Sequence, residues 1–296
     1  MSGKIHRLSP VLWMAPLALF LILFQLWPSI DVFRLSFTNM RFALDTVEYS
    51  LRSYRNIVQD PEIPQMLRTT FVFVAFSVFF QVVLGLIIAL VVDQGYRLRV
   101  PGSIFARTTV TMGWAIPGII TGLIWLLLLN ESRAGILTYW FMRIGIGRIP
   151  FLSTSSIALT MAVIANVWRG TASSMILQYS ALQTIPKEIL EAGIIDGASA
   201  LQMIRYIVVG FIKPIIFMVV ILNTVATFNT FDMIVSLTGG GPGRATEVIA
   251  LHIYAKLFRQ LNFGGGAAVA VVLLALNVGL ALVYFALLRR DPRSNV

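Results

Sequence analysis

Six long hydrophobic runs, each followed by a more polar segment, set the pattern of this chain. A bilayer core about 30 Å thick needs roughly 20 apolar residues in helical conformation, and each run is close to that length. Hydrocarbon offers no hydrogen-bond partners, so a run that crosses it must satisfy its own backbone amides, which favours helix. The pattern predicts an all-α integral membrane protein with six transmembrane helices, near residues 10–28, 69–92, 104–129, 156–181, 211–235 and 265–288.

Composition agrees with a membrane protein. Hydrophobic residues make up 57% of the chain and charged residues 12%, against about 45–50% and about 25% in soluble domains. The net charge of +10 comes from residues concentrated between the apolar runs, which favours anionic lipid headgroups over nucleic acid as partners. The chain has no cysteine, and its two histidines lie in separate loops. We therefore expect no disulfide, no metal site and no catalytic residue.

Basic residues near the ends of the apolar runs predict the orientation of the chain. Their total number is equal on the two sides, but they are denser in the segments that become cytoplasmic if residues 4–7 and 289–293 are inside. Both termini are then cytoplasmic, and residues 29–68, 130–155 and 236–264 are external. The first run follows basic residues as a signal peptide does, but it lacks a small-residue cleavage site, so we interpret it as a retained span.

The segment 183–214 is too polar to span and too patterned for a plain linker. Pro186 is typical of a helix start, whereas Gly193 weakens a helix and Asp196-Gly197 interrupts it. Asp196 can cap a second helix from Ala198. That helix would carry an apolar face, made of Leu201, Ile204, Ile207 and Val208. Two short helices at a sharp angle suit docking into a groove of a soluble partner, although a solvated surface hairpin fits the pattern equally well.

Two stretches resemble a known family. Residues 191–198, Glu-Ala-Gly-Ile-Ile-Asp-Gly-Ala, resemble the EAA loop of binding-protein-dependent ABC importer permeases. Gly193 replaces the second alanine of that pattern, which should loosen the first helix, while Ile204 and Gly210 replace a usual phenylalanine and proline. Residues 231–254, which include Leu-Thr-Gly-Gly-Gly-Pro at 237–242, resemble sugar permeases of the maltose and glycerol-3-phosphate importers.

The resemblance implies a type I ABC importer permease fold, with one transmembrane permease domain over 1–296. Such permeases sit in the cytoplasmic membrane of a bacterium or archaeon, pair with a second permease, and receive a sugar-like solute from an external solute-binding protein. ATP and Mg would be bound by a separate ATPase dimer, and this chain would catalyse no reaction and hold no cofactor. By similarity, the ATPase-coupling residues are Glu191, Ala192, Asp196, Gly197 and Ala198.

Polar residues within the fourth and fifth runs are candidates for a translocation path. Arg169 is costly in a span unless it is paired or hydrated, so it is a functional candidate by default. The spacing of Asn223, Asn229 and Asp232 puts them on roughly one side of the fifth run. With Asn166 they would line a path for a hydroxyl-rich solute. The alternative is that these groups only tie helices together, with Asp232 as a partner for Arg169.

Two rival functions remain open on the residues. An ion- or proton-coupled secondary transporter would need a carboxylate relay in the spans, for which Asp232 alone is weak support. A membrane-embedded enzyme would need convergent catalytic groups, which the pattern does not provide. The glycine-rich segment 239–244 lacks the lysine and hydroxyl of a phosphate-binding loop. Any ATP hydrolysis must then take place on another chain.

Overall fold

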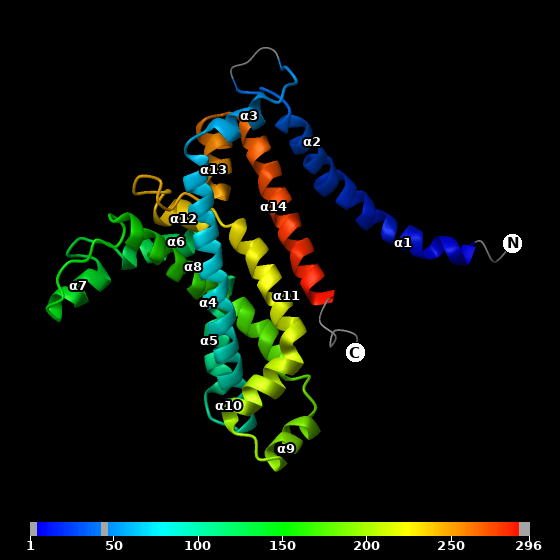
Figure 1. The fold of residues 1–296 in the computed structure, drawn as a ribbon, viewed down its shortest axis with the longest axis vertical. Coiled ribbons are helices and arrows are strands. Elements are labelled where there is room, and N and C mark those ends of the chain that lie inside the picture. Colours follow the sequence, from blue (N-terminus) through cyan, green and yellow to red (C-terminus); the bar gives the residue numbers. More distant parts are fainter. Residues whose placement is uncertain (1–4, 43–46, 290–296) are drawn as a thin grey trace. The chain divides into compact units, whose positions relative to one another are not determined.

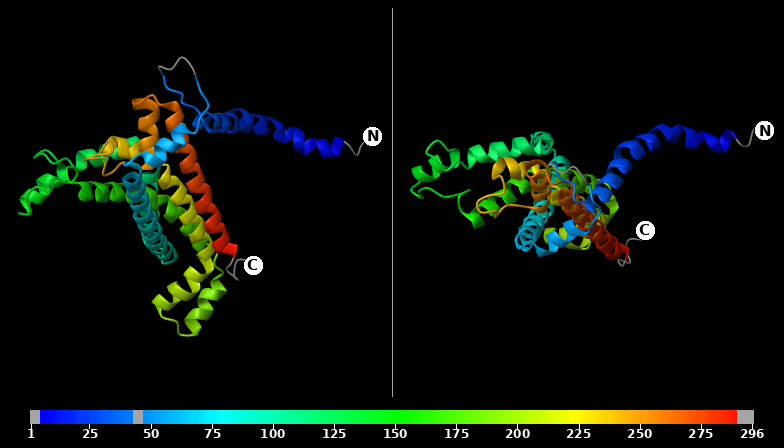
Figure 2. Two further views of the ribbon diagram at one scale, coloured as in Figure 1. Left: turned by 45° about the horizontal axis from the view of Figure 1, so that its top comes forward. Right: turned by 90° about the horizontal axis from the view of Figure 1, so that it is seen from above.

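The computed structural model describes residues 5–42 and 47–289, with side chains described from 13 to 286 within these limits. This part of the chain is built from helices and contains no β-strand beyond an isolated bridge between Thr38 and Tyr49. The chain divides into two compact units (Figures 1 and 2). Unit 1 comprises residues 1–63 and 252–275, and unit 2 comprises residues 64–251 and 276–296. The basic residues Lys4, Arg290 and Arg293, on which the orientation partly depends, lie outside the described residues.

Unit 1 begins with one long helix formed by α1 (Ile5–Leu21), the π-helical turn η1 (Ile22–Leu26) and α2 (Trp27–Ser36). The apolar part that can span a membrane is Trp13–Ser36, and within it only Ser36, at its end, is buried. The predicted end at residue 28 is therefore wrong. Pro28 has no N–H to donate, but the wide turn before it, in which the Trp27 N–H donates to the Ile22 carbonyl, lets the helix continue.

The rest of unit 1 surrounds a polar cavity. A short helix, α3 (Arg52–Gln59), follows the first span, and the chain returns to this unit at the end of α13 (Ile249–Tyr254). It continues through the π-helical turn η3 (Ala255–Arg259) into the first part of α14 (Phe263–Arg289). The extended segment before α3 is joined to the residues after η3, including the start of α14, by backbone hydrogen bonds, from Phe42 to Leu261 and from Gly264 to Met40.

Unit 2 is organised around α8, which packs against α5, α6, α11 and α12. Its apolar core includes Met175, Leu182, Val208 and Ile212. Figures 1 and 2 place α9 and α10 at one end of this unit, past the ends of α8 and α11. The helices of unit 2, apart from α13 and α14, are α4 (Ile63–Arg97), α5 (Ser103–Ala115), α6 (Gly118–Leu128), α7 (Ile136–Arg143), α8 (Ser155–Leu182), α9 (Lys187–Ile195), α10 (Ala200–Gln202), η2 (Met203–Val208), α11 (Val209–Phe228) and α12 (Asp232–Leu237).

Small residues let α4 and α8 approach closely. A Cβ on Gly85 would lie 2.4 Å from the Cβ of Ser174, and one on Gly170 would lie 2.3 Å from Nε2 of Gln81. Two glutamine amides cross this contact: Gln81 donates to the Asn166 carbonyl at 3.0 Å, and Gln178 donates to the Val82 carbonyl at 3.1 Å. Close backbone approach and interhelical hydrogen bonds are the main attractive forces between helices in a membrane.

The prediction of one continuous span at 104–129 is wrong. Helix α5 ends at Ala115, α6 begins at Gly118, and the two are bent by 104°. Pro117 explains the break, because proline removes a helical N–H and pushes the preceding residue out of the helical region. Ile116 accordingly has φ −75° and ψ 125°.

The predicted fifth span, 211–235, has different limits. The helix starts earlier, since Ala200–Phe228 forms one apolar stretch, and it ends before residue 229. The Asn229 side chain donates to the Val225 carbonyl at 2.7 Å, which satisfies a carbonyl of the last turn. The chain then turns before α12, so Asp232 begins a new helix instead of continuing the fifth span.

Judged by the length and apolar composition of its helices, the structure has fewer candidate spans than the six that were predicted. Among the described residues, four helices are long and apolar enough to cross a membrane, and the bent α5–α6 pair would make a fifth. Helix α8 follows the predicted limits 156–181 within a residue, but its polar residues keep it out of this group. The runs at 69–92 and 265–288 lie inside the longer helices α4 and α14.

Candidate functional site

A cavity of about 500 Å³ lies within unit 2 and opens between α4, α5, α8, α11 and the start of α12. Every residue predicted from the sequence to line a path contributes to its wall: Asn166, Arg169, Asn223, Asn229 and Asp232. The break between α11 and α12 is what brings the last two residues to the cavity, since a continuous helix would carry them past it. The structure thus gathers the five side chains around one space.

Asn223 both lines the cavity and ties two helices together. Its Nδ2 donates to Oγ of Ser174 at 2.7 Å, and its Oδ1 is 3.5 Å from the hydroxyl of Ser173, both on α8. Asn223 is buried, so a hydrogen bond formed there is shielded from competing water. The sequence left open whether Asn223 lines a path or only ties helices together. In the structure, its side-chain amide lines the cavity and also joins α11 to α8.

Asp232 lies against the first turn of α6. A Cβ built on Gly118 would be 1.9 Å from a carboxylate oxygen of Asp232, so only glycine leaves room for the acid at this point. The first amides of a helix lack internal partners and favour a nearby negative charge. The carboxylate therefore has a structural role at α6 as well as a place on the cavity wall.

Arg169 faces the cavity without a protein partner. It is half-buried on α8, and no ion pair or side-chain hydrogen bond joins it to any residue that the structure describes. Arg169 and Asp232 have opposite charges, but among the described residues they form no ion pair with each other. One turn earlier, Nδ2 of Asn166 is buried without a hydrogen-bond partner in the same described residues. The Arg169 guanidinium is therefore a donor available to a cavity ligand, whereas the Asn166 amide nitrogen is covered by protein.

Sequence reasoning missed several lining residues. Gln81 on α4 and Trp114 on α5 contribute to the wall, as do Ser173, Thr227 and Thr230. A glutamine in the middle of an apolar run is itself a signal, because a polar side chain in a span needs a partner. Trp114 is 58% exposed and lines the cavity.

The segment 183–214 forms a helical hairpin of α9, a tight turn and α10, which continues through η2 into α11. Gly197 has a φ of +76°, a conformation that favours glycine. Its N–H donates to the Ile194 carbonyl at 3.0 Å, and the N–H of Ala198 donates to the Gly193 carbonyl at 3.0 Å. This pair of bonds is the Schellman arrangement that ends many helices.

Two details of the predicted hairpin are wrong. Asp196 does not cap the second helix, because the turn already uses residues 196–198. The cap is Ser199, whose side chain and that of Gln202 form a reciprocal capping box. Gly193 does not loosen α9 either. It is buried where a Cβ would lie 2.6 Å from Cδ1 of Ile207, so it allows the two arms of the hairpin to pack closely.

The outer surface of the hairpin combines apolar and acidic groups. Ile195 is 85% exposed and Leu201 is 73% exposed, beside the exposed side chain of Glu191. The base of the hairpin is tied to α4, since Asp93 accepts hydrogen bonds from Gln183 and from Arg97. Such a patch, held at a fixed place by polar contacts, has the character of a docking surface.

Comparison with known proteins shows which proteins this chain is similar to. The permease protein UgpA of the sn-glycerol-3-phosphate transport system of Agrobacterium fabrum is 30% identical over 95% of this chain and 94% of its own length. The trehalose/maltose transport system permease protein MalF of Thermococcus litoralis is 31% identical over 95% and 94%. A bacterial ABC transporter that imports the acidic polysaccharide alginate contains a chain with a TM-score of 0.82, 20% identity and 98% coverage of both chains.

The fold is therefore that of type I ABC importer permeases. The chain belongs to the family described as binding-protein-dependent transport system inner membrane component, which it matches over residues 81–291. It is the permease subunit of an ABC importer, and the alternative of an ion- or proton-coupled secondary transporter is set aside. The matched region includes the cavity of unit 2 and the hairpin.

Proposed function

We propose that the cavity of unit 2 is part of the translocation path for a hydroxyl-rich, sugar-like solute. The observation that supports this most directly is that Arg169, which has no ion-pair or side-chain hydrogen-bond partner among the described residues, lines the same cavity as Asn223 and Asp232. Amides and hydroxyls supply both donors and acceptors, which a polyhydroxy solute requires. The named relatives handle a glycerol phosphate, trehalose or maltose, and alginate, which share this hydroxyl-rich chemistry.

The hairpin is proposed to couple this path to ATP hydrolysis on a separate ATPase dimer that binds ATP and Mg. Glu191 would contact a basic group of that partner, while Ala192, Asp196, Gly197 and Ala198 hold the angle between the arms. A second permease would complete the path, and a solute-binding protein would deliver the solute. The structurally similar alginate transporter has been seen in complex with a periplasmic protein that carries an alginate pentasaccharide, which supports such a delivery. Both chain termini would then be cytoplasmic.

Cysteine accessibility tests the path, because the chain has no native cysteine to react. Ser173 lines the cavity, and its neighbour Ser174 is buried outside it, so the two near-isosteric serine-to-cysteine variants form a matched pair. In the assembled importer, Ser173→Cys should react with a small hydrophilic thiol reagent at least about tenfold faster than Ser174→Cys, since thiolate chemistry requires access. Asn229→Cys should behave like Ser173→Cys.

Solute and its binding protein should change the rate at Ser173→Cys, whereas Ser174→Cys should stay slow in every state. Equal, slow reaction at positions 173, 174 and 229 with and without ATP would contradict the path. The polar groups would then serve only to hold α8 and α11 together.

A further inference from the structure

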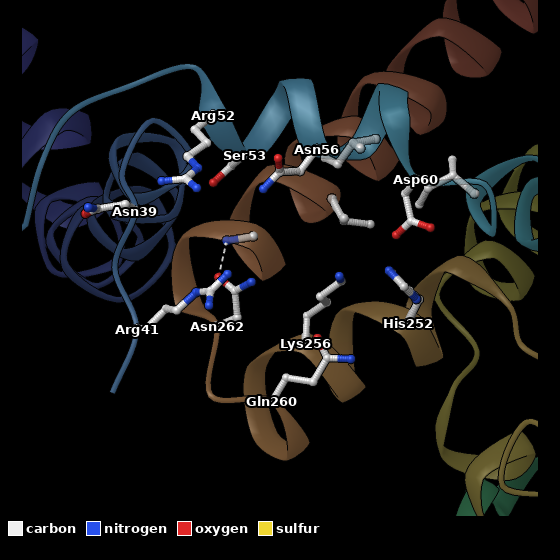
Figure 3. A pocket seen from close by; sticks show the side chains of 14 residues that line it. Asn39, Arg41, Arg52, Ser53, Asn56, Asp60, His252, Lys256, Gln260 and Asn262 are labelled. Carbon is white, nitrogen blue, oxygen red and sulfur yellow. Dashed lines mark hydrogen bonds between the residues drawn. The ribbon is translucent and has the colours of Figure 1, made fainter. Parts of the chain in front are cut away.

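Unit 1 contains a polar cavity that plays no part in the proposed path. Its volume is about 350 Å³, and α3, the extended segment near residue 40, η3 and the start of α14 surround it (Figure 3). It shares no residue with the cavity of unit 2. The cavity is open to solvent, since Arg41, Arg52 and Asn56 are exposed, so its polar groups are accessible to a dissolved or headgroup ligand.

The wall of this cavity is strongly cationic. Arg41, Arg52 and Lys256 contribute three positive charges, and Asp60 contributes one negative charge. No ion pair or side-chain hydrogen bond is formed by the three cations with other residues in the described ranges. Asp60 is already engaged, since its carboxylate accepts the Glu62 N–H at 3.0 Å. The three cations and the one aspartate give the lining a net formal charge of about +2.

The cavity is held in shape by backbone contacts instead of by the charged groups. The Gly264 N–H donates to the Met40 carbonyl at 3.0 Å, and the Phe42 N–H donates to the Leu261 carbonyl at 3.1 Å. A Cβ on Gly264 would lie 2.2 Å from the carbonyl oxygen of Thr38, so glycine permits this approach. The walls therefore stand in place before any ligand arrives, which lowers the ordering cost of binding.

We propose that this cavity binds a phosphate monoester group. Such a group carries about −1.5 to −2 charge at neutral pH, which matches the net charge of the lining, whereas a carboxylate would neutralise only half of it. Guanidinium groups fit phosphate oxygens in a two-pronged geometry, and lysine supplies a compact point charge. Figure 3 shows Lys256 and Asn56 directed into the cavity from opposite sides.

An oriented amide adds to the charge match. Oδ1 of Asn262 accepts the Gly265 N–H at 3.0 Å, so the Nδ2 of Asn262 remains to donate into the cavity (Figure 3). Asn56 on α3 provides a second amide. Phosphate oxygens accept several hydrogen bonds at once, so neutral donors beside the cations increase both affinity and selectivity. The same group is offered by a soluble phosphate ester and by the headgroup of phosphatidic acid.

The test uses the full chain in nanodiscs of phosphatidylcholine and radiolabelled inorganic phosphate as the probe, at about pH 8, where phosphate is a dianion. Lys256→Gln and Arg52→Gln should each weaken phosphate binding about tenfold or more, because each removes a charge-assisted hydrogen bond. The control is Arg55→Gln, which removes an exposed arginine of the same helix α3 outside the cavity and should leave affinity unchanged. Acetate should compete poorly.

A second arm identifies the source of the phosphate. Phosphatidic acid added to the nanodiscs should displace labelled phosphate if the natural ligand is a lipid headgroup, and should leave it bound if the ligand is soluble. Arg52 and Arg41 are exposed side chains, so their glutamine variants keep the test valid if Lys256→Gln does not fold. The proposal is overturned if wild type shows no saturable phosphate binding, if Arg55→Gln is equally weakened, or if acetate competes as well as phosphate.

Discussion

Gly197 is the residue on which the geometry of the hairpin of α9 and α10 depends most directly. No heavy atom lies within 4 Å of a Cβ built there, so a substitution would meet no clash and would act only through the backbone. Gly197→Leu should strain the turn by about 1–3 kcal/mol, and Gly197→Asn by less, since asparagine tolerates this conformation. Solute uptake and ATPase copurification should therefore fall strongly for Leu and mildly for Asn, at equal protein levels. Identical uptake by the two variants would mean that the angle of the turn does not matter.

Glu131 organises the connection between α6 and α8. Its carboxylate accepts the N–H groups of Leu152 and Ser153 at 2.7 and 2.8 Å, and the Ser153 hydroxyl at 2.7 Å. Burial acts to raise the pKa of Glu131, but these hydrogen bonds, helped by Arg148, outweigh burial and hold the pKa below its ordinary value. A carboxylate with a lowered pKa stabilises the folded connection above its unfolded pKa of about 4.3, and this contribution is lost as pH falls through the folded pKa.

Glu131→Gln should consequently destabilise the connection by roughly 1 kcal/mol at neutral pH. The difference between wild type and variant should shrink as pH falls through the lowered folded pKa of Glu131, because the wild-type carboxylate is then protonated too. Amide hydrogen exchange at Leu152 and Ser153 measures this locally, and Glu48→Gln, far along the chain in unit 1, serves as a control. A difference that stays constant from neutral pH down to the onset of acid unfolding would contradict the assignment.

At the scale of elements, α6 and α12 depend on two glycines one turn apart. Gly118 faces Asp232, and a Cβ on Gly122 would lie 2.0 Å from Oγ of Ser236 and 2.4 Å from the Met233 carbonyl oxygen. This small-residue spacing lets two helices touch along their backbones. The close packing also fixes Asp232 at the start of α6, and so it sets one wall of the cavity.

Gly122→Ala should push α12 away from α6, because a backbone carbonyl cannot turn aside as a flexible side chain can. We expect a loss of about 1–3 kcal/mol, the usual cost of overpacking, seen as a lower melting temperature of the purified protein in detergent. Gly279→Ala is the matched control, since α14 has open space at that position and alanine is the better helix former. Equal melting temperatures for the two variants would show that the contact relaxes freely.

Helix limits show which elements could be predicted from hydropathy. The runs 156–181 and 69–92 correspond to α8 and α4 because long apolar stretches have few alternatives in a bilayer. The bend at Pro117 was missed because hydropathy stays high across it, and the break after Phe228 was missed because the apolar run resumes at Met233 after a short, mostly polar stretch. A proline in a span can kink the helix, break it or leave it continuous, and the groups packed around the proline decide which outcome occurs. Pro28 and Pro214 lie inside continuous helices, whereas Pro117 separates two.

At the scale of the whole molecule, orientation follows from where charges crowd the helix ends. Gln94 and Glu188 should face the cytoplasm, and Arg133 the outside; all three side chains are exposed. Single cysteines at these positions in intact cells should react with a membrane-impermeant thiol reagent at 133 only, and at 94 and 188 only after lysis. Labelling of 188 in intact cells would put the hairpin on the side away from ATP, which would exclude its coupling role.

The sequence by itself determined the all-helical membrane class, the place of the hairpin and the residue types of the path, because hydropathy and turn chemistry are local properties. Tertiary structure alone decided that Asn223 bonds to Ser174, that Gln81 and Trp114 reach the same cavity as Arg169, and that Ser199 caps the second arm of the hairpin. It also decided that Lys256 lines the same cavity of unit 1 as Arg41 and Arg52, which lie far from it in the sequence. These arrangements depend on which helices pack against each other. In a membrane, small residues and single hydrogen bonds determine helix packing, and they leave no periodic signal along the chain.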